Sequence, residues 1–164
     1  MPVSPMLQEL LSAERITILV EPGDRATVLE AAARLLADPP PGHTGALATR
    51  TIGDSLRSRE QLASTAIGHG VAIPHARISS IDESRGAFLR LTQPVDFAAA
   101  DGERVDLVFA LVVPEHYIQQ HLQQLADLAA HFADPAFRAD LRDAANVDQL
   151  RRRLLAGPSL HARG

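Results

Sequence analysis

Histidine is the side chain best suited to chemistry in this sequence, which has seven histidines and no cysteine. An imidazole with its ordinary pKa near ~6.5 is largely neutral at pH 7 and can act as a nucleophile. His75 stands out because it follows an apolar stretch at residues 71–73 and Pro74, in the segment GVAIPHAR. Pro74 restricts its own φ and favours extended geometry at Ile73, so the backbone leading to His75 is stiff. From these residues alone, His75 is either reactive or an ordinary residue at a strand end.

A second histidine, His121, lies on the apolar face of a helix predicted at residues 117–133. A histidine on such a face needs a buried polar partner or a polar pocket. The spacing leaves open whether His121 meets His75 or bonds a backbone carbonyl in the core. His131 falls outside this face and is expected to be exposed, and His43 and His161 are expected to be solvated. At ~100° per residue, the apolar face comprises Ile118, Leu122, Leu125, Leu128, Ala129 and Phe132.

The segment before His75 offers donors for an anion. Ser64 and Thr65 carry hydroxyls and backbone N–H groups. Gly68 and Gly70 permit close approach of the backbone to an oxyanion, and Arg59 is a candidate bidentate ligand of a phosphate. Ordinary turn chemistry also explains each residue, and no Gly-x4-Gly-Lys pattern occurs. Two histidines, an arginine and this loop are nevertheless the parts that a phosphohistidine site needs.

Length and composition limit the classes of protein that this sequence can encode. We expect one domain over residues 1–164, with a flexible tail at about 158–164. The net charge of −4, the 4% aromatic content and the absence of tryptophan argue against nucleic-acid binding. Without cysteine there are no disulfides and no thiolate zinc sites. No signal peptide is visible and no apolar stretch is long enough to span a membrane, so a cytoplasmic protein without membrane insertion is expected.

Hydrophobic patterning predicts an α/β fold with a mixed β-sheet of about five strands between helices on both faces. Strands are predicted at 16–20, 71–73, 86–91, 94–97 and 105–113, the last one central and buried on both faces. Helices are predicted after the N-cap Asp24, over about 47–56 with an end near 57–60, and over 117–133. Two more follow, one with Asp134 as N-cap and one from Asn146 to Gly157. Residues 38–45 and the segment before residue 71 are predicted as loops.

Two segments carry a resemblance to a known family. SREQLASTAIGHGVAIPHAR (58–77) resembles the active-site segment of the fructose/mannitol-type enzyme IIA domains of the bacterial phosphotransferase system. VDLVFALVVPEHYIQQHLQQLADLAAHFAD (105–134) is similar to their second signature, an apolar strand, a Val-Pro and a helix with an early histidine. The resemblance covers most of residues 47–155 and is weaker before them. Within the family, the free-standing domain is most similar to the nitrogen-regulatory enzyme IIA proteins.

The resemblance implies a phosphoryl relay on a mixed sheet between helical layers. It implies that His75 accepts a phosphoryl group from an HPr-type carrier protein, that His121 is the second active-site histidine, and that Arg59 lies beside the phosphate. It implies no cofactor and no metal, and it leaves the regulatory protein targets unspecified.

Three residues depart from the family pattern. Ala66 and Ala76 stand where glycine is common, and His69 replaces a small polar residue between two glycines. A positive φ at Ala66 would be strained. We therefore expect differences in the shape of this loop and of the rim that meets partner proteins.

Three other functions compete with a regulatory relay. A sugar-specific enzyme IIA would use the same chemistry and pass phosphate to a fructose or mannitol IIB domain. A protein-binding module would never be phosphorylated. A histidine metal site is disfavoured because His69 and His75 lack the helical i, i+4 spacing and no His-Glu-x-x-His motif occurs.

Overall fold

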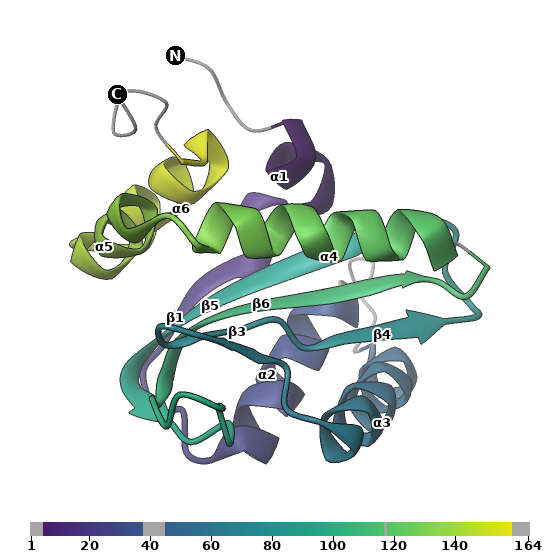
Figure 1. Ribbon diagram of the computed structural model, residues 1–164. Coiled ribbons are helices and arrows are strands. Elements are labelled where there is room, and N and C mark those ends of the chain that lie inside the picture. Colours follow the sequence, from purple (N-terminus) through teal and green to yellow (C-terminus); the bar gives the residue numbers. More distant parts are fainter. Residues whose placement is uncertain (1–4, 38–44, 117, 159–164) are drawn as a thin grey trace.

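The computed structural model describes residues 5–37, 45–116 and 118–158. Within them a six-stranded mixed sheet lies between two layers of helices (Figure 1). The strands are β1 (Ile16–Leu19), β2 (Ala66–Gly68), β3 (Val71–Ala72), β4 (His75–Ile78), β5 (Arg85–Val95) and β6 (Val105–Pro114). The helices are α1 (Pro5–Leu10), a 3-10 turn (Ala13–Arg15), α2 (Arg25–Ala37), α3 (Ala46–Leu62), α4 (Ile118–Phe132), α5 (Pro135–Asp143) and α6 (Val147–Ala156).

The sheet is built around β6, as predicted for the apolar run at 105–113. The strand order is β1-β5-β6-β3-β2, and β4 pairs with β6 beyond the end of β3. β5 and β6 are antiparallel, whereas β1 is parallel to β5, and β3 and β4 are parallel to β6. Nine of the ten residues of β6 are buried, because it has neighbours on both sides and helices over both faces.

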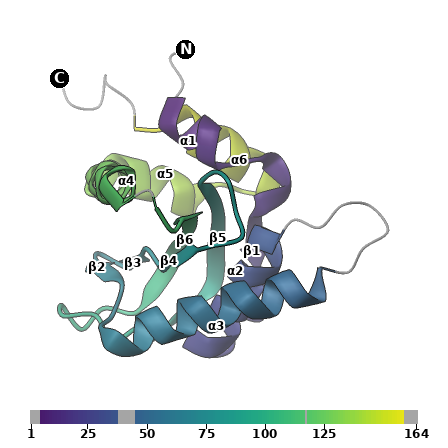
Figure 2. The same cartoon turned by 90° about the vertical axis from the view of Figure 1, so that its right-hand side faces the viewer.

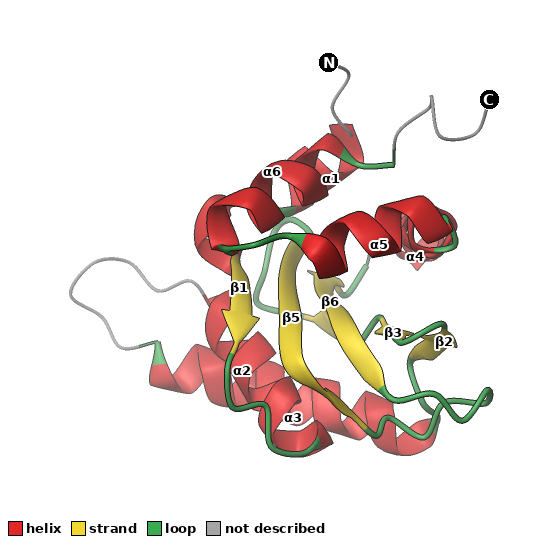
Figure 3. Cartoon of the chain, turned by 90° about the vertical axis from the view of Figure 1, so that its left-hand side faces the viewer, coloured by secondary structure: helices red, strands yellow, loops and turns green. Residues whose placement is uncertain are grey.

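The two faces of the sheet are covered by different helices. One apolar cluster joins α2 and α3 to the face that carries Ala76, Leu89 and Val108. The other joins α1, α4, α5 and α6 to the face that carries Phe88 and Leu111. Figure 2 and Figure 3 show these layers from the two sides. The predicted sandwich of a mixed sheet between helices is thus confirmed.

Three strands differ from their predictions. β1 is an edge strand, so only Ile16 is fully buried and Val20 lies 70% exposed beyond its end. The strands predicted at 86–91 and 94–97 are one strand, β5, in which Pro94 lies within a register shift between Arg90 and Val95. A proline without an N–H fits there because the ladder is irregular. The strand predicted at 71–73 ends at Ala72.

Two short strands at the predicted loop were not predicted from the sequence. β2 forms inside this loop and pairs with β3. His75 is the first residue of β4, whereas the sequence predicted that it follows the end of a strand. Pro74 interrupts the edge, but the Leu111 N–H donates to the Pro74 carbonyl at 2.9 Å, which keeps the chain alongside β6. α3 continues to Leu62, beyond its predicted end, and α1 was not predicted.

The predicted helix caps are confirmed. Asp24 accepts the Thr27 N–H at 2.9 Å at the start of α2. Asp134 accepts from Ala136 and Phe137 at the start of α5, and Asn146 accepts from Gln149 at the start of α6. Gly157 ends α6 with a positive φ of 73°. The predicted loop at 38–44, with His43, and the tail at 159–164, with His161, lie outside the described residues.

Close packing at Gly86 gives a test of the fold. A Cβ at Gly86 would lie 2.8 Å and 2.9 Å from Cε1 and Cζ of the buried Phe109 ring. We expect Gly86→Ala to lower the free energy of unfolding by about 1–3 kcal/mol, because Phe109 must move within a close-packed core. Denaturant unfolding measures this change.

Gly53→Ala is the matched control. In α3, a Cβ at Gly53 would meet the end of the Arg57 side chain at 3.2 Å, which can move. The higher helix propensity of alanine, worth about 1 kcal/mol, should make this variant at least as stable as the wild type. Equal unfolding midpoints for the two variants would contradict the packing described for Gly86.

Candidate functional site

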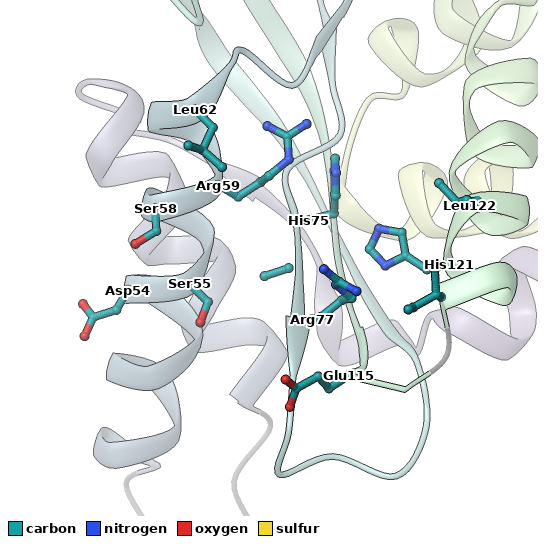
Figure 4. A pocket seen from close by; sticks show the side chains of 12 residues that line it. Asp54, Ser55, Ser58, Arg59, Leu62, His75, Arg77, Glu115, His121 and Leu122 are labelled. Atoms are coloured by element: carbon teal, nitrogen blue, oxygen red, sulfur yellow. The ribbon is translucent and has the colours of Figure 1, made fainter.

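A cavity of about 800 Å³ opens at the edge of the sheet, between α3, β4 and the first turn of α4. Figure 2 shows β4 between these two helices, and Figure 4 shows the side chains that line the cavity. Polar and charged residues form much of the wall: Asp54, Ser55, Ser58, Arg59, His75, Arg77, Glu115 and His121. The apolar remainder is Leu62, Ala76, Ile118 and Leu122.

His75 enters the cavity from the first position of β4. Its ring Nδ1 lies 2.7 Å from the Ile73 carbonyl oxygen. A carbonyl oxygen can only accept, so Nδ1 carries the proton and Nε2 of the neutral ring keeps its lone pair. The Ile73 N–H donates in turn to the Thr65 carbonyl at 3.0 Å, which fixes this part of the backbone. His75 is therefore held as one tautomer by its own chain.

His121 meets His75 across the cavity, which answers the question left open by its position on a helix face. The two ring centroids lie 5.3 Å apart, edge to face at 69°. His121 is 8% exposed, and its Nδ1 is buried without a hydrogen-bond partner within the described residues. The pKa of His121 is lowered to about 4, mainly by burial and then, in decreasing order, by the nearby His75, Arg77 and Arg59.

Both imidazoles are neutral at pH 7. Burial also lowers the pKa of His75, and the Arg59 cation acts in the same direction. The Ile73 hydrogen bond and the Glu60 carboxylate oppose this shift without reversing it. A neutral His75 has a free lone pair, as a nucleophile requires.

The first turn of α4 differs from its prediction. Ile118 and Leu122 share the predicted core face with His121 but are 56% and 63% exposed. This turn lies at the rim of the cavity, whereas Leu128 and Phe132 further along the helix are buried in the core. The prediction of an exposed His131 is wrong, because His131 is half-buried and its Nδ1 lies 2.7 Å from the Asp127 carbonyl oxygen.

Arg59 comes from the last turn of α3, and its guanidinium points towards His75 (Figure 4). Its Nη1 donates to the Ala63 carbonyl at 2.9 Å, which satisfies a carbonyl just beyond the helix end. The structure thus brings together His75, His121 and Arg59, three residues selected from the sequence.

Glu60 supports this arrangement and was missed by the sequence analysis. It is 5% exposed, and its carboxylate accepts from the Thr65 N–H at 3.0 Å and the Thr65 hydroxyl at 2.6 Å. Arg25 of α2 lies 3.6 Å from the same carboxylate. A carboxylate near a helix C-terminus is unfavourable for the helix dipole, and this could have marked Glu60 as a residue with a local partner.

The four loop residues expected to bind phosphate do not line this cavity. The Ser64 hydroxyl donates to the Phe97 carbonyl, and Thr65 is engaged with Glu60. Gly70 lines a second cavity of about 550 Å³. A Cβ at Gly68 would lie 3.3 Å from the Asp101 carboxylate, in the wall of that second cavity.

Three residues depart from the family pattern. Ala66 and His69 lie outside the cavity that contains the two histidines, whereas Ala76 is part of its wall. Ala66 lies in β2, pairs with Ala72 and does not have a positive φ. The left-handed conformation falls instead on His69, at φ 58°, whose N–H donates to Asp101 and whose carbonyl accepts from Arg142. Ala76 is 7% exposed and belongs to the cluster under α2 and α3.

The described residues contain no group of three or more His, Cys, Asp or Glu side chains placed to hold a metal ion. None of their helices combines the length and the apolar character needed to cross a membrane.

The low pKa of His121 makes stability depend on pH. Below pH 6.5 the unfolded chain binds a proton at residue 121, whereas the folded protein does so only near pH 4. The free energy of unfolding therefore falls as the pH falls between these values, by about 3 kcal/mol in total. We expect His121→Gln to remove this part of the pH dependence in urea unfolding measured from pH 7 to pH 4.

His116→Gln is the control, because His116 is an exposed histidine that directly follows Glu115 of the cavity wall. The loss of stability that His121 causes between pH 6.5 and pH 4 should remain in this variant. A constant stability difference between wild type and His121→Gln over the whole range would show that His121 is not held neutral.

Comparisons with known proteins identify a family for this chain. The family model for the phosphoenolpyruvate-dependent sugar phosphotransferase system, EIIA 2, matches residues 9–156. A nitrogen regulatory protein of Pseudomonas aeruginosa is 41% identical over 137 residues, which cover 84% of each chain. The crystal structure of nitrogen regulatory protein IIA-Ntr from Neisseria meningitidis is similar, with a TM-score of 0.78, 34% identity and coverage of 91% of this chain and 99% of that one.

The fold is also shared with a more distant structure. IIA mannitol from Escherichia coli matches with a TM-score of 0.69 and 19% identity, over 88% of this chain and 98% of that one. The resemblance of the two sequence segments is thereby confirmed, and the chain belongs to the EIIA 2 family of the phosphoenolpyruvate-dependent sugar phosphotransferase system.

Proposed function

We propose that this protein relays a phosphoryl group through Nε2 of His75 and acts as a regulatory switch that partner proteins read. The observation that carries the proposal is the hydrogen bond from His75 Nδ1 to the Ile73 carbonyl, at 2.7 Å. It leaves the lone pair on Nε2, in a cavity that also contains His121 and Arg59. The donor in this proposal is the phosphohistidine of an HPr-type carrier protein.

The transfer takes place between two imidazoles, that of the carrier's phosphohistidine and that of His75. The lone pair of His75 Nε2 forms a bond to phosphorus while the N–P bond of the carrier breaks, and that electron pair returns to the carrier's imidazole nitrogen. The proton on His75 Nδ1 stays in place, and the Ile73 carbonyl stabilises the positive charge that develops on the ring. The transition state is loose, so the protein contributes mainly position and charge stabilisation.

Arg59 and His121 are placed to stabilise the transferred charge. The Arg59 guanidinium keeps donors besides the Nη1 that bonds Ala63, and it points towards His75 (Figure 4). His121 lies edge to face with the acceptor ring. A cation and an imidazole on two sides of the phosphoryl oxygens are suited to the charge on these oxygens.

The rim of the cavity supports a protein as the donor. Leu62, Ile118 and Leu122 line the cavity and are 83%, 56% and 63% exposed. Large apolar side chains grouped around a polar centre are typical of protein-binding surfaces. A docked carrier would cover them and exclude water from the transfer.

Phosphorylation gives a direct physical basis for regulation. A phosphoryl group adds about two negative charges at pH 7 to a surface that meets partners. The names of the relatives in Pseudomonas aeruginosa and Neisseria meningitidis support a nitrogen-related regulatory role. A fructose- or mannitol-type IIB domain offered as acceptor tests this part: efficient transfer to it would assign a sugar-specific role instead.

We predict that His75→Ala abolishes phosphorylation by the carrier. Incubation with a phosphorylated HPr-type protein, followed by intact-mass measurement, should show one added phosphoryl group in the wild type and none in the variant. His116→Ala, which removes an exposed histidine near the same cavity, should gain phosphate as the wild type does. Phosphorylation of His75→Ala would refute the assignment, and an unphosphorylated wild type would favour a binding module.

For His121→Ala we expect phosphorylation to persist but transfer to and from the carrier to slow by about tenfold or more. The reason is that His121 contacts the reacting ring without supplying the nucleophile. Rapid-quench measurements of the forward and reverse rates check this. Wild-type rates in both directions would remove His121 from the site.

A further inference from the structure

Resting on the function proposed above, we infer that Arg77 is a second arginine that binds the phosphoryl group on His75. In this role it determines how far the phosphoryl equilibrium lies towards this protein. Arg59, from α3, approaches the acceptor from one side, and Arg77 comes from the acceptor strand itself.

The strand geometry places Arg77 on the same face as His75. Residues two apart on a strand point to the same side, with Cα atoms ~7 Å apart. β4 pairs with β6 in the register His75–Leu111 and Arg77–Val113, and Leu111 and Val113 belong to the face covered by α4. Ala76, between them, packs on the opposite face. Arg77 therefore extends towards α4, and Figure 4 shows its guanidinium between His121 and Glu115.

The cation is close enough to act on the His121 imidazole. Arg77 lowers the pKa of His121 by charge repulsion, and Figure 4 shows its guanidinium beside that ring. Its side chain is exposed to the cavity, so the guanidinium can reorient when a dianion forms on His75.

The guanidinium of Arg77 also has its donors available. Within the described residues it forms no hydrogen bond or ion pair, whereas Nη1 of Arg59 is already bonded to the Ala63 carbonyl. A guanidinium with its full set of donors can bind a phosphoryl group through two parallel hydrogen bonds. The acidic residues of the cavity wall are the exposed Asp54 and Glu115, and the single charge of either carboxylate competes poorly with a phosphoryl dianion.

An equilibrium measurement separates phosphoryl binding from carrier docking. The constant for phosphoryl exchange depends only on the free phosphorylated and unphosphorylated proteins, and the complex does not enter it. A docking contact changes the forward and reverse rates together. A contact with the phosphoryl group changes the constant itself.

The experiment mixes the phosphorylated HPr-type carrier with wild type, Arg77→Gln or Arg77→Lys, and reaches the final ratio from both directions by intact mass. We expect Arg77→Gln to shift the equilibrium about tenfold towards the carrier and Arg77→Lys to shift it less. Arg104→Gln is the charge-matched control, because Arg104 is exposed in the wall of the second cavity, and it should leave the constant unchanged.

An unchanged constant for Arg77→Gln, even with slower rates, would overturn the inference. If the wild type itself gains no phosphate, the proposed function fails; if it gains phosphate and Arg77→Gln reaches the same ratio, only the role of Arg77 fails. An NMR titration of the histidines in the unphosphorylated variant gives an independent readout. Loss of the Arg77 cation should raise the pKa of His121, and an unmoved pKa would show that the guanidinium does not approach the site.

Discussion

The hydrogen bond between Nδ1 of His75 and the carbonyl of Ile73 is the interaction on which the site depends. It selects one tautomer, leaves the lone pair on Nε2, and holds the ring against the backbone. Pro74 separates β3 from β4, the His75 ring reaches back to the carbonyl two residues earlier, and the Leu111 N–H of β6 donates to the Pro74 carbonyl. His75 is thus part of the sheet edge, where backbone pairing with β6 fixes its position.

The helices on the two faces bring the remaining groups to this edge. α3 packs on one face and carries Arg59, which is directed at His75, in its last turn. Glu60 of the same turn accepts hydrogen bonds from Thr65, beyond the helix end. α4 packs on the other face through Leu128 and Phe132, but its first turn extends to the rim, where His121 meets His75 and the apolar neighbours stay exposed. One end of this helix is therefore buried in the core, and the other carries exposed apolar side chains at the rim of the cavity.

The sequence was sufficient to predict the layers and the central strand, because hydrophobic periodicity indicates them. The two family segments point to His75, His121 and Arg59, and the structure places these three residues around one cavity. It was insufficient where contacts with other parts of the chain determine the local structure. The Ser64 hydroxyl donates to the carbonyl of Phe97, which is distant in the sequence, and no local pattern indicates this bond. The Thr65 hydroxyl is engaged with the nearby Glu60, for which the only signal is a carboxylate close to a helix C-terminus. The exposure of Ile118 and Leu122 depends on how far the first turn of α4 extends past the sheet. The helical spacing of apolar residues gives no information on this point. β4 is recognised only through its pairing with β6.

The most direct test of this account is to identify the phosphorylated nitrogen. Histidine side-chain ¹H–¹⁵N NMR of the phosphorylated protein distinguishes the two ring positions and assigns them to one residue. The account predicts a single phosphohistidine, His75, phosphorylated on Nε2 and protonated on Nδ1. Phosphate on Nδ1 of His75, or on any other histidine, would contradict it.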